Sequence, residues 1–298
     1  MVGGADAVRA RLDGGLVPAV PVPFRGRTLD ADALAGYARW MAAHPVAGVA
    51  VNVHTGRGRH LAESARRQVL TMWRAALPDR VLVAGAWNVA SASEARELGA
   101  DAVLAFAPQG QDPVPYHEEL SRELPVIAFH LYAAAGGAAY DDATLRGILE
   151  LPGVLGIKVA TLDSVMTFQR IASLCGALPR TLLISGEDRF LGYSLLLGAR
   201  AALVGMGAAL TDLQAALLRA RADSDWPRFV RLSAALDRFG AATFTAPMEG
   251  YVRRMLWAAA EDGGVPAESC DDPWGPALPA AEREAVRRAV RDARAAGG

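Results

Sequence analysis

Lysine is almost absent from this chain. Its 298 residues include 31 lysines and arginines, and only one of them, Lys158, is a lysine. Arginine stays protonated and cannot act as an amine nucleophile, whereas a desolvated lysine can lose its proton and attack a carbonyl carbon. A codon bias toward arginine that spared one lysine by chance is the plainer alternative. Composition alone leaves both explanations open.

Other scarcities exclude whole classes of protein. Two cysteines, Cys175 and Cys270, are too few for a disulfide framework and favour a reducing, cytoplasmic location. A net charge of −1 argues against a nucleic-acid partner or an anionic membrane surface. No run of about 18 apolar residues occurs, so we expect no transmembrane helix. Residues 1–15 lack the apolar core of a signal peptide.

What the chain does contain is an alternation of short apolar runs with longer segments of helical periodicity. Eight runs are expected to be strands, at residues 16–22, 48–53, 81–86, 102–107, 126–131, 155–159, 182–185 and 201–204. The helices expected after them lie at residues 31–43, 62–76, 91–98, 115–123, 142–149, 163–175, 188–197 and 210–221. Continuously apolar strands separated by helices indicate a buried parallel sheet, and eight such units favour a closed (β/α)8 TIM barrel.

The last part of the chain is expected to be helical throughout, with segments at residues 226–239, 247–261 and 280–295. We therefore divide the chain into a barrel with a short N-terminal helix at residues 1–222 and a helical extension packed on it at residues 223–298. In such barrels the active site lies where the strands end at their carboxyl side.

Lys158 lies in the segment GVLGIKVATLD, near the end of the sixth expected strand. Its strand neighbours are apolar, so burial should lower the pKa of its amine and make it nucleophilic near neutral pH. The structural alternative is a buried ion pair, for which Glu187, at the end of the next strand, is the candidate partner. Residues at the last two strand ends, Gly186 and Glu187 together with Val204, are expected to bind substrate.

A second cluster, VNVHTGRGRHL, follows the second expected strand. Thr55, Gly56 and nearby backbone amides could form a small anion-binding nest for a carboxylate, although an ordinary glycine-rich turn would look the same. His54 is a candidate general acid or base. His54 and His60 also suggest a metal site, but no cysteine or acidic ligand accompanies them, so we predict no metal.

A third cluster closes the fifth expected strand. Because side chains alternate along a strand, Phe129 and Leu131 share one face and His130 and Tyr132 the other. One of the two pairs faces the barrel interior, and the sequence does not decide which. Phe129 is taken as a substrate-binding residue, and His130 and Tyr132 as candidate catalytic residues.

These clusters, in this order, resemble the dihydrodipicolinate synthase and N-acetylneuraminate lyase superfamily of class I aldolase-type barrels. The resemblance runs from GLVPAVPVPF at residues 15–24 to the C-terminal helices. Residues 55–56 match the end of the family's G-T-T-G-E motif, and residues 185–188 its seventh-strand pattern. Residues 248–253 lie where the family often begins a helix with P-x-K. The specific match is G-I-K at residues 156–158, the Schiff-base strand.

The chain departs from the family at several functional positions. The strand-five tyrosine that relays protons in the family corresponds to Phe129, which has no hydroxyl. His54 replaces the first threonine of G-T-T-G-E and Arg57 replaces its glutamate. In the family's synthases, a tyrosine is contributed to the site across the subunit interface, and its position corresponds to the neighbourhood of Gly110 here. The arginine that binds the second substrate in those synthases corresponds to the neighbourhood of Ala134. The departures argue against dihydrodipicolinate synthase and sialic acid lyase activities.

The resemblance implies that Lys158 forms an imine with pyruvate or another 2-oxo acid and needs no cofactor. The imine would support carbon–carbon cleavage, condensation or dehydration, with protons moved by His54, His130 or Tyr132. It also implies a homodimer or homotetramer. Two alternatives stay open: a catalytically reduced barrel that binds an oxo acid or sugar acid as a sensor or accessory protein, and a metal-assisted lyase using His54, Glu187 and Asp188.

Overall fold

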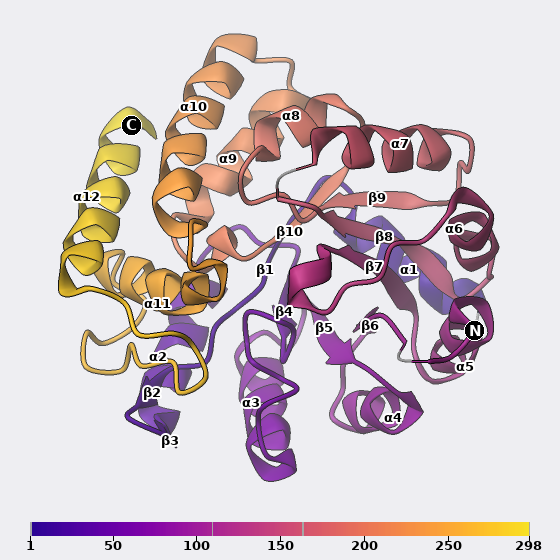
Figure 1. Ribbon diagram of the computed structural model, residues 1–298, viewed down its shortest axis with the longest axis horizontal. Coiled ribbons are helices and arrows are strands. Elements are labelled where there is room, and N and C mark those ends of the chain that lie inside the picture. Colours follow the sequence, from indigo (N-terminus) through magenta and orange to yellow (C-terminus); the bar gives the residue numbers. More distant parts are fainter. Residues whose placement is uncertain (1, 109, 163, 298) are drawn as a thin grey trace.

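A closed barrel of eight parallel strands forms the centre of the molecule (Figure 1). The computed structural model describes residues 2–108, 110–162 and 164–297. In order around the barrel the strands are β1 (Leu16–Pro18), β4 (Gly48–Val51), β5 (Val81–Ala86), β6 (Ala102–Ala105), β7 (Val126–Leu131), β8 (Val154–Ala160), β9 (Leu182–Ser185) and β10 (Ala201–Val204). A parallel bridge between Ala19 and Ala50 joins the first strand to the second. All these strand residues are buried, as expected for a sheet with an enclosed interior and a covered outer face.

Helices surround the barrel and connect its strands. They are α2 (Ala31–Ala42), α3 (Glu63–Ala76), α4 (Val89–Glu97), α5 (Pro113–Glu123), α6 (Asp142–Leu149), α7 (Val165–Gly176), α8 (Leu191–Leu196) and α9 (Thr211–Ala222). The predicted (β/α)8 TIM barrel with a helical C-terminal region is confirmed. The helix expected at residues 163–175 begins at Val165, and Asp163 lies outside the described residues.

The N-terminal helix α1 (Val2–Leu12) packs at the end of the barrel where the strands begin. Its apolar residues Ala5, Val8 and Leu12 share one buried cluster with inward-facing strand residues such as Leu155. The guanidinium Nε of Arg9 donates to the carbonyl oxygen of Leu155 at 2.9 Å. The carboxyl ends of the strands, at the other end of the barrel, are left to form a site.

Two local differences from the sequence-based expectation follow from backbone hydrogen bonding. The first strand stops at Pro18 instead of residue 22, because Pro21 and Pro23 have no N–H to donate to a ladder. A short hairpin of β2 (Phe24–Arg25) and β3 (Thr28–Leu29) was not expected. Phe24 of this hairpin forms a bridge with Cys270, so the start of the barrel is joined to the C-terminal region.

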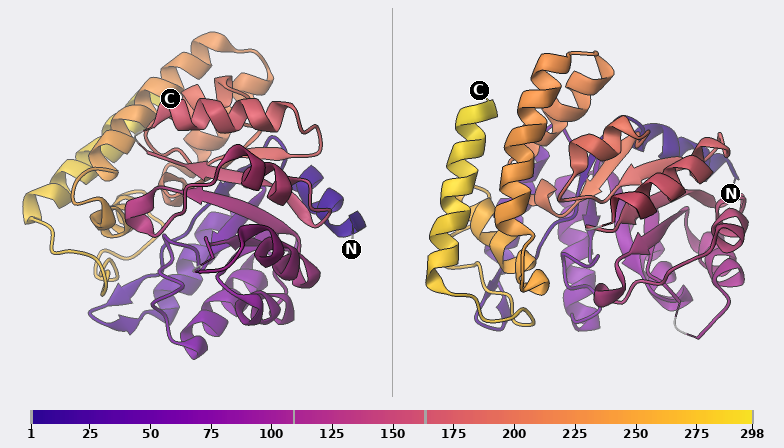
Figure 2. Two further views of the ribbon diagram at one scale, coloured as in Figure 1. Left: turned by 45° about the vertical axis from the view of Figure 1, so that its right-hand side comes forward. Right: turned by 45° about the horizontal axis from the view of Figure 1, so that its top comes forward.

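Three long helices follow the barrel: α10 (Trp226–Thr243), α11 (Tyr251–Glu261) and α12 (Ala280–Gly297). In Figure 1 and both views of Figure 2, α12 lies beside α10 at one side of the barrel. A single helix was expected at residues 247–261, but a 3-10 turn, η3 (Met248–Gly250), precedes α11. Pro247 and Gly250 both disfavour a helix interior. The division into a barrel at 1–222 and an extension at 223–298 stays a prediction. No helix in the described ranges is long and apolar enough to cross a bilayer.

Candidate active site

Lys158 lies near the carboxyl end of β8 and faces the barrel interior. Ile157 and Val159, its strand neighbours, belong to the cluster between the sheet and the outer helices, whereas Ala160 belongs to the interior cluster. Lys158 and Ala160 both line a cleft at this end of the barrel, with an empty volume of about 380 Å³ including its open mouth. The lysine that the sequence singled out therefore lies at a cavity.

The environment of the Lys158 amine favours loss of its proton. The residue is buried, and burial lowers the pKa of the amine to about 8 from the usual 10.5, although the carboxylates of Asp188 and Glu187 act in the opposite direction. Its Nζ lies 4.4 Å from the centre of the Phe129 ring. Within the described part of the chain, no carboxylate oxygen lies within ion-pair distance of Nζ. The predicted structural alternative, an ion pair with Glu187, is therefore wrong.

The carboxylates of Glu187 and Asp188 both accept hydrogen bonds from backbone N–H groups. The carboxylate of Glu187 accepts hydrogen bonds from the N–H groups of Thr161 and Leu162 at 2.7 and 2.8 Å, which ties the β8 loop to β9. Asp188 lines the cleft and accepts from the N–H of Met206 at 2.7 Å. Burial raises the pKa of each carboxyl to about 7. The helix expected to begin at Asp188 begins instead at Leu191, and Asp188 turns toward Lys158.

Gly186 makes room for the lysine side chain. A β-carbon at this position would lie 2.5 Å from Cε of Lys158 and 2.9 Å from the β-carbon of Ala160. Gly186 also lines the cleft. Its role here is to leave space beside the amine.

Replacing Gly186 by alanine is expected to displace Lys158 and to slow imine formation by about 100-fold, the usual effect of misplacing a reacting group by about 1 Å. The measurement is the rate of adduct formation with a 2-oxo acid. Gly176→Ala is the matched control, because a β-carbon there meets nothing within 4 Å. Equal rates in the two variants would show that the position of Lys158 does not depend on Gly186.

A tyrosine from the C-terminal region completes the cleft. The hydroxyl of Tyr251, the first residue of α11, lies 3.0 Å from Nδ1 of His54 and 3.1 Å from the hydroxyl of Thr55. All three residues line the cleft that contains Lys158. Burial lowers the pKa of His54 to about 4, so its imidazole is neutral at pH 7 and does not titrate in the range that the sequence analysis expected.

Strand β7 presents Phe129 and Leu131 to the cleft, and this decides the alternative that the sequence left open. Tyr132, just past the strand end, also lines the cleft. His130 does not, because the two-residue period of the strand directs it away from Lys158, where burial lowers its pKa. The hypothesis that His130 moves protons at the lysine is therefore corrected.

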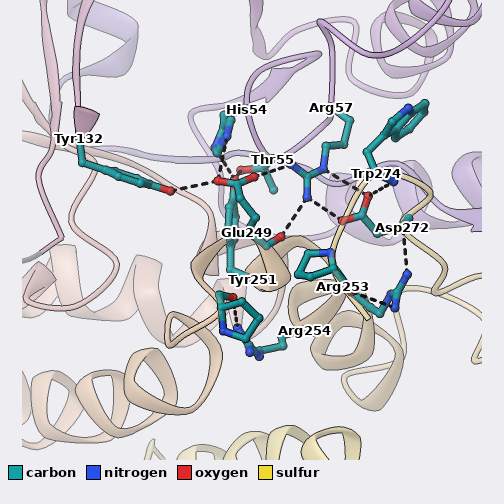
Figure 3. A network of polar contacts seen from close by, with 12 residues as sticks. His54, Thr55, Arg57, Tyr132, Glu249, Tyr251, Arg253, Arg254, Asp272 and Trp274 are labelled. Atoms are coloured by element: carbon teal, nitrogen blue, oxygen red, sulfur yellow. Dashed lines mark hydrogen bonds and ion pairs between the residues drawn. The ribbon is translucent and has the colours of Figure 1, made fainter. Parts of the chain in front are cut away.

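A buried arginine joins this site to the C-terminal region (Figure 3). Arg57 donates through Nε and Nη2 to both carboxylate oxygens of Asp272, at 3.2 and 2.7 Å. Its Nη1 lies 2.6 Å from the carboxylate of Glu249. Glu249 in turn lies 3.4 Å from Nε2 of His54 and accepts from the hydroxyl of Tyr132, also at 3.4 Å.

Sequence reasoning missed Tyr251, Glu249 and Asp272. They lie about 200 residues from His54 along the chain, and the docking of η3, of α11 and of the loop after α11 brings them there. The expected substrate-binding residues Gly56, Glu187 and Val204 do not line the cleft; Val204 is fully buried in β10. Among the residues that the structure describes, no group of three or more histidine, cysteine or acidic side chains is arranged to hold a metal ion.

Comparison with known proteins gives a consistent picture. No family model matches the chain. A 4-hydroxy-tetrahydrodipicolinate synthase from Phenylobacterium zucineum is 27% identical over 94% of this chain and 97% of its own length. An N-acetylneuraminate lyase structure from Mycoplasma synoviae is 18% identical, with a TM-score of 0.78 over 95% of this chain and 98% of that one. A prophage protein of the dihydrodipicolinic acid synthase family from E. coli K12, solved in complex with pyruvate, is 20% identical with a TM-score of 0.82 over 94% and 98%.

The two structural comparisons show the shared barrel fold, and the full-length sequence relative places the chain among the proteins of that fold. The match extends through the C-terminal helices that carry Tyr251 and Glu249. The sequence and fold comparisons therefore support membership of this chain in the dihydrodipicolinate synthase and N-acetylneuraminate lyase superfamily.

Proposed function

We propose that this protein is a lyase or aldolase that binds pyruvate, or another 2-oxo acid, as an imine on Lys158. The neutral amine adds to the keto carbon, water leaves, and the protonated imine accepts the electron pair of a bond broken or formed at the neighbouring carbon. The observation that carries the proposal is the buried amine of Lys158, beside an open cleft and with its pKa lowered to about 8. No cofactor is needed for this step.

A place for the carboxylate of the acid is available next to the amine. Thr55 lines the cleft, and within the described ranges the backbone N–H groups of Thr55 and Gly56 have no acceptor. Free N–H groups in a turn are good donors to a carboxylate. Gly56 does not itself line the cleft, but its N–H follows directly after that of Thr55 in the same turn.

The similar proteins support the same chemistry. The relative from Phenylobacterium zucineum is named for a synthase reaction, and the E. coli protein was solved with pyruvate. Departures at His54, Arg57 and Phe129 leave the second substrate, and the choice among cleavage, condensation and dehydration, unassigned. Assembly as a homodimer or homotetramer also stays a prediction.

Neither alternative function gains a specific observation. The sensor hypothesis rested on the missing hydroxyl at Phe129, but two hydroxyls, of Tyr132 and Tyr251, line the cleft. The metal-assisted hypothesis grouped His54, Glu187 and Asp188. Their side chains bond instead to Tyr251, to the loop at residues 161–162, and to the N–H of Met206.

Incubation with pyruvate and a panel of other 2-oxo acids, followed by borohydride reduction, is expected to add the mass of one reduced acid to the protein. The rate of imine formation should rise about tenfold per pH unit below pH 8 and level off above it, because only the neutral amine reacts and its pKa is about 8. Intact-protein mass spectrometry at timed intervals measures both.

Absence of an adduct with every acid would refute the proposed function. A rate that still climbs tenfold per unit between pH 9 and pH 10 would contradict the lowered pKa, because an unperturbed lysine titrates near 10.5.

A further inference from the structure

A chain of hydrogen-bonding groups leads from the cleft toward solvent. It begins at the hydroxyl of Tyr251, passes to Nδ1 of His54 at 3.0 Å, and continues from Nε2 of His54 to the carboxylate of Glu249 at 3.4 Å. The ring of Tyr251 is buried, whereas the side chain of Glu249 is 39% exposed. The arrangement therefore connects a sequestered hydroxyl with a partly exposed carboxylate (Figure 3).

The position of Tyr251 is fixed from several sides. Its ring stacks on Phe244, with centroids 4.8 Å apart, and a β-carbon on Gly205 would lie 3.3 Å from its ring edge. The hydroxyl of Thr55 lies 3.1 Å from its own. The hydroxyl of Thr55 can donate to the phenol oxygen while the phenol donates to the imidazole. Both hydroxyl protons therefore have an acceptor.

The electrostatics of the chain suit proton transfer. Burial keeps His54 neutral at pH 7, so Nδ1 can accept while Nε2 carries a proton that Glu249 can take. The Arg57 guanidinium holds Glu249 in place at 2.6 Å. Burial acts to raise the pKa of this carboxyl, but the hydrogen bond and charge of Arg57 help to keep it below its usual range. The ring of Phe129, whose centre lies 4.4 Å from the amine, has no group that could take a proton.

We propose that Tyr251 is the proton-transfer residue of this site and that His54 and Glu249 connect it to solvent. The inference rests on the proposed function and deepens it. When the protonated imine loses a proton from the carbon next to the imine carbon, that proton goes to the phenol oxygen. The phenol proton passes to Nδ1 of His54, and the Nε2 proton passes to Glu249. The C–H electron pair becomes the carbon–carbon double bond of an enamine, and the imine nitrogen becomes neutral.

The experiment separates imine formation from proton transfer. The 2-oxo acid that gives the highest trapping yield is incubated with enzyme in D2O, and NMR follows exchange of its C3 protons. Borohydride trapping is run on the same samples. Tyr251→Phe is expected to lower the exchange rate by at least about 100-fold, the effect of losing a general acid–base group, while the final adduct yield stays near that of the native protein. Tyr193→Phe, on the exposed face of α8, is the matched control and should exchange at the native rate.

A second variant guards against a folding defect. His54→Gln can still hydrogen-bond to the phenol but cannot pass a proton on, so exchange should fall by at least about tenfold with trapping retained. Exchange near the native rate in Tyr251→Phe would overturn the proposal, as would a larger loss in Tyr132→Phe than in Tyr251→Phe. Loss of the adduct itself in Tyr251→Phe would also overturn it, because the tyrosine would then act in binding. If the native protein traps no acid, the proposed function fails and this inference falls with it.

Discussion

Replacing Lys158 by arginine is expected to abolish the borohydride-trapped adduct and to lower turnover by at least about 10⁴-fold, as removal of a covalent nucleophile does in other enzymes. Arginine keeps the positive charge and much of the length of lysine but cannot become a neutral amine. Because the chain has no other lysine, the variant retains only its terminal amine as a site for an imine. Intact-mass spectrometry of native and variant protein, after reduction with the same acid, measures the difference.

Lys158→Met is the companion variant, because a guanidinium is bulkier than an ammonium group and the lysine side chain packs closely against Gly186. Methionine fills a similar volume without charge and should preserve the fold, which a thermal unfolding curve checks. Adduct or turnover at native levels in either folded variant would rule out a role for the lysine amine in covalent catalysis.

Replacing Arg57 by leucine is expected to destabilise the protein by about 3–5 kcal/mol, because it leaves a buried carboxylate without its partner. The side chain of Asp272 is only 1% exposed and receives two hydrogen bonds from Arg57. The same change releases Glu249 and should weaken proton transfer as well. Urea unfolding of the two proteins gives the free-energy difference.

Arg59→Leu is the control for this change, because Arg59 is exposed, two residues away and in the same loop. We expect its free energy of unfolding to change by less than about 0.5 kcal/mol, as is usual at surface sites. The double variant Arg57→Leu with Asp272→Leu should be more stable than Arg57→Leu alone, because it removes the unpaired charge. If the double variant loses as much stability as the sum of the single changes, the ion pair does not account for the effect.

Lys158 could be found from the sequence because two independent signals met at one residue. It is the only lysine, and it lies near the end of the sixth of the eight expected strands. The series itself predicted the barrel, since local apolar patterning decides which residues form buried strands. Four of the eight expected strands, at 81–86, 126–131, 182–185 and 201–204, have the bounds that the structure shows.

Tyr251 and Glu249 could not be found in this way. Nothing in the local sequence of α11 marks a proton-transfer group, and its position at the cleft depends on tertiary contacts with Arg57, Phe244 and Gly205. A resemblance placed residues 248–253 at a family helix start but gave no role to them. The clearest indication was an absence. Phe129 lacks a hydroxyl, so a site that still transfers protons needs a proton-transfer group from another part of the chain.

The direction of side chains near strand ends was also beyond the sequence. The alternation of side chains along a strand grouped His130 with Tyr132. Tyr132, however, lies past the end of β7, where this alternation no longer applies. It therefore lines the cleft, while His130 does not. Glu187 was expected at the substrate for a similar reason. Its oxygens instead satisfy the N–H groups of the loop after β8, a need that only the folded backbone reveals.

The most direct test of the account is a crystal structure of the protein soaked with the 2-oxo acid that traps best. We predict continuous electron density from Nζ of Lys158 to the keto carbon, with the carboxylate at the N–H groups of Thr55 and Gly56 and the C3 carbon beside the hydroxyl of Tyr251. An acid bound without a covalent bond, or bound away from Lys158, would contradict it.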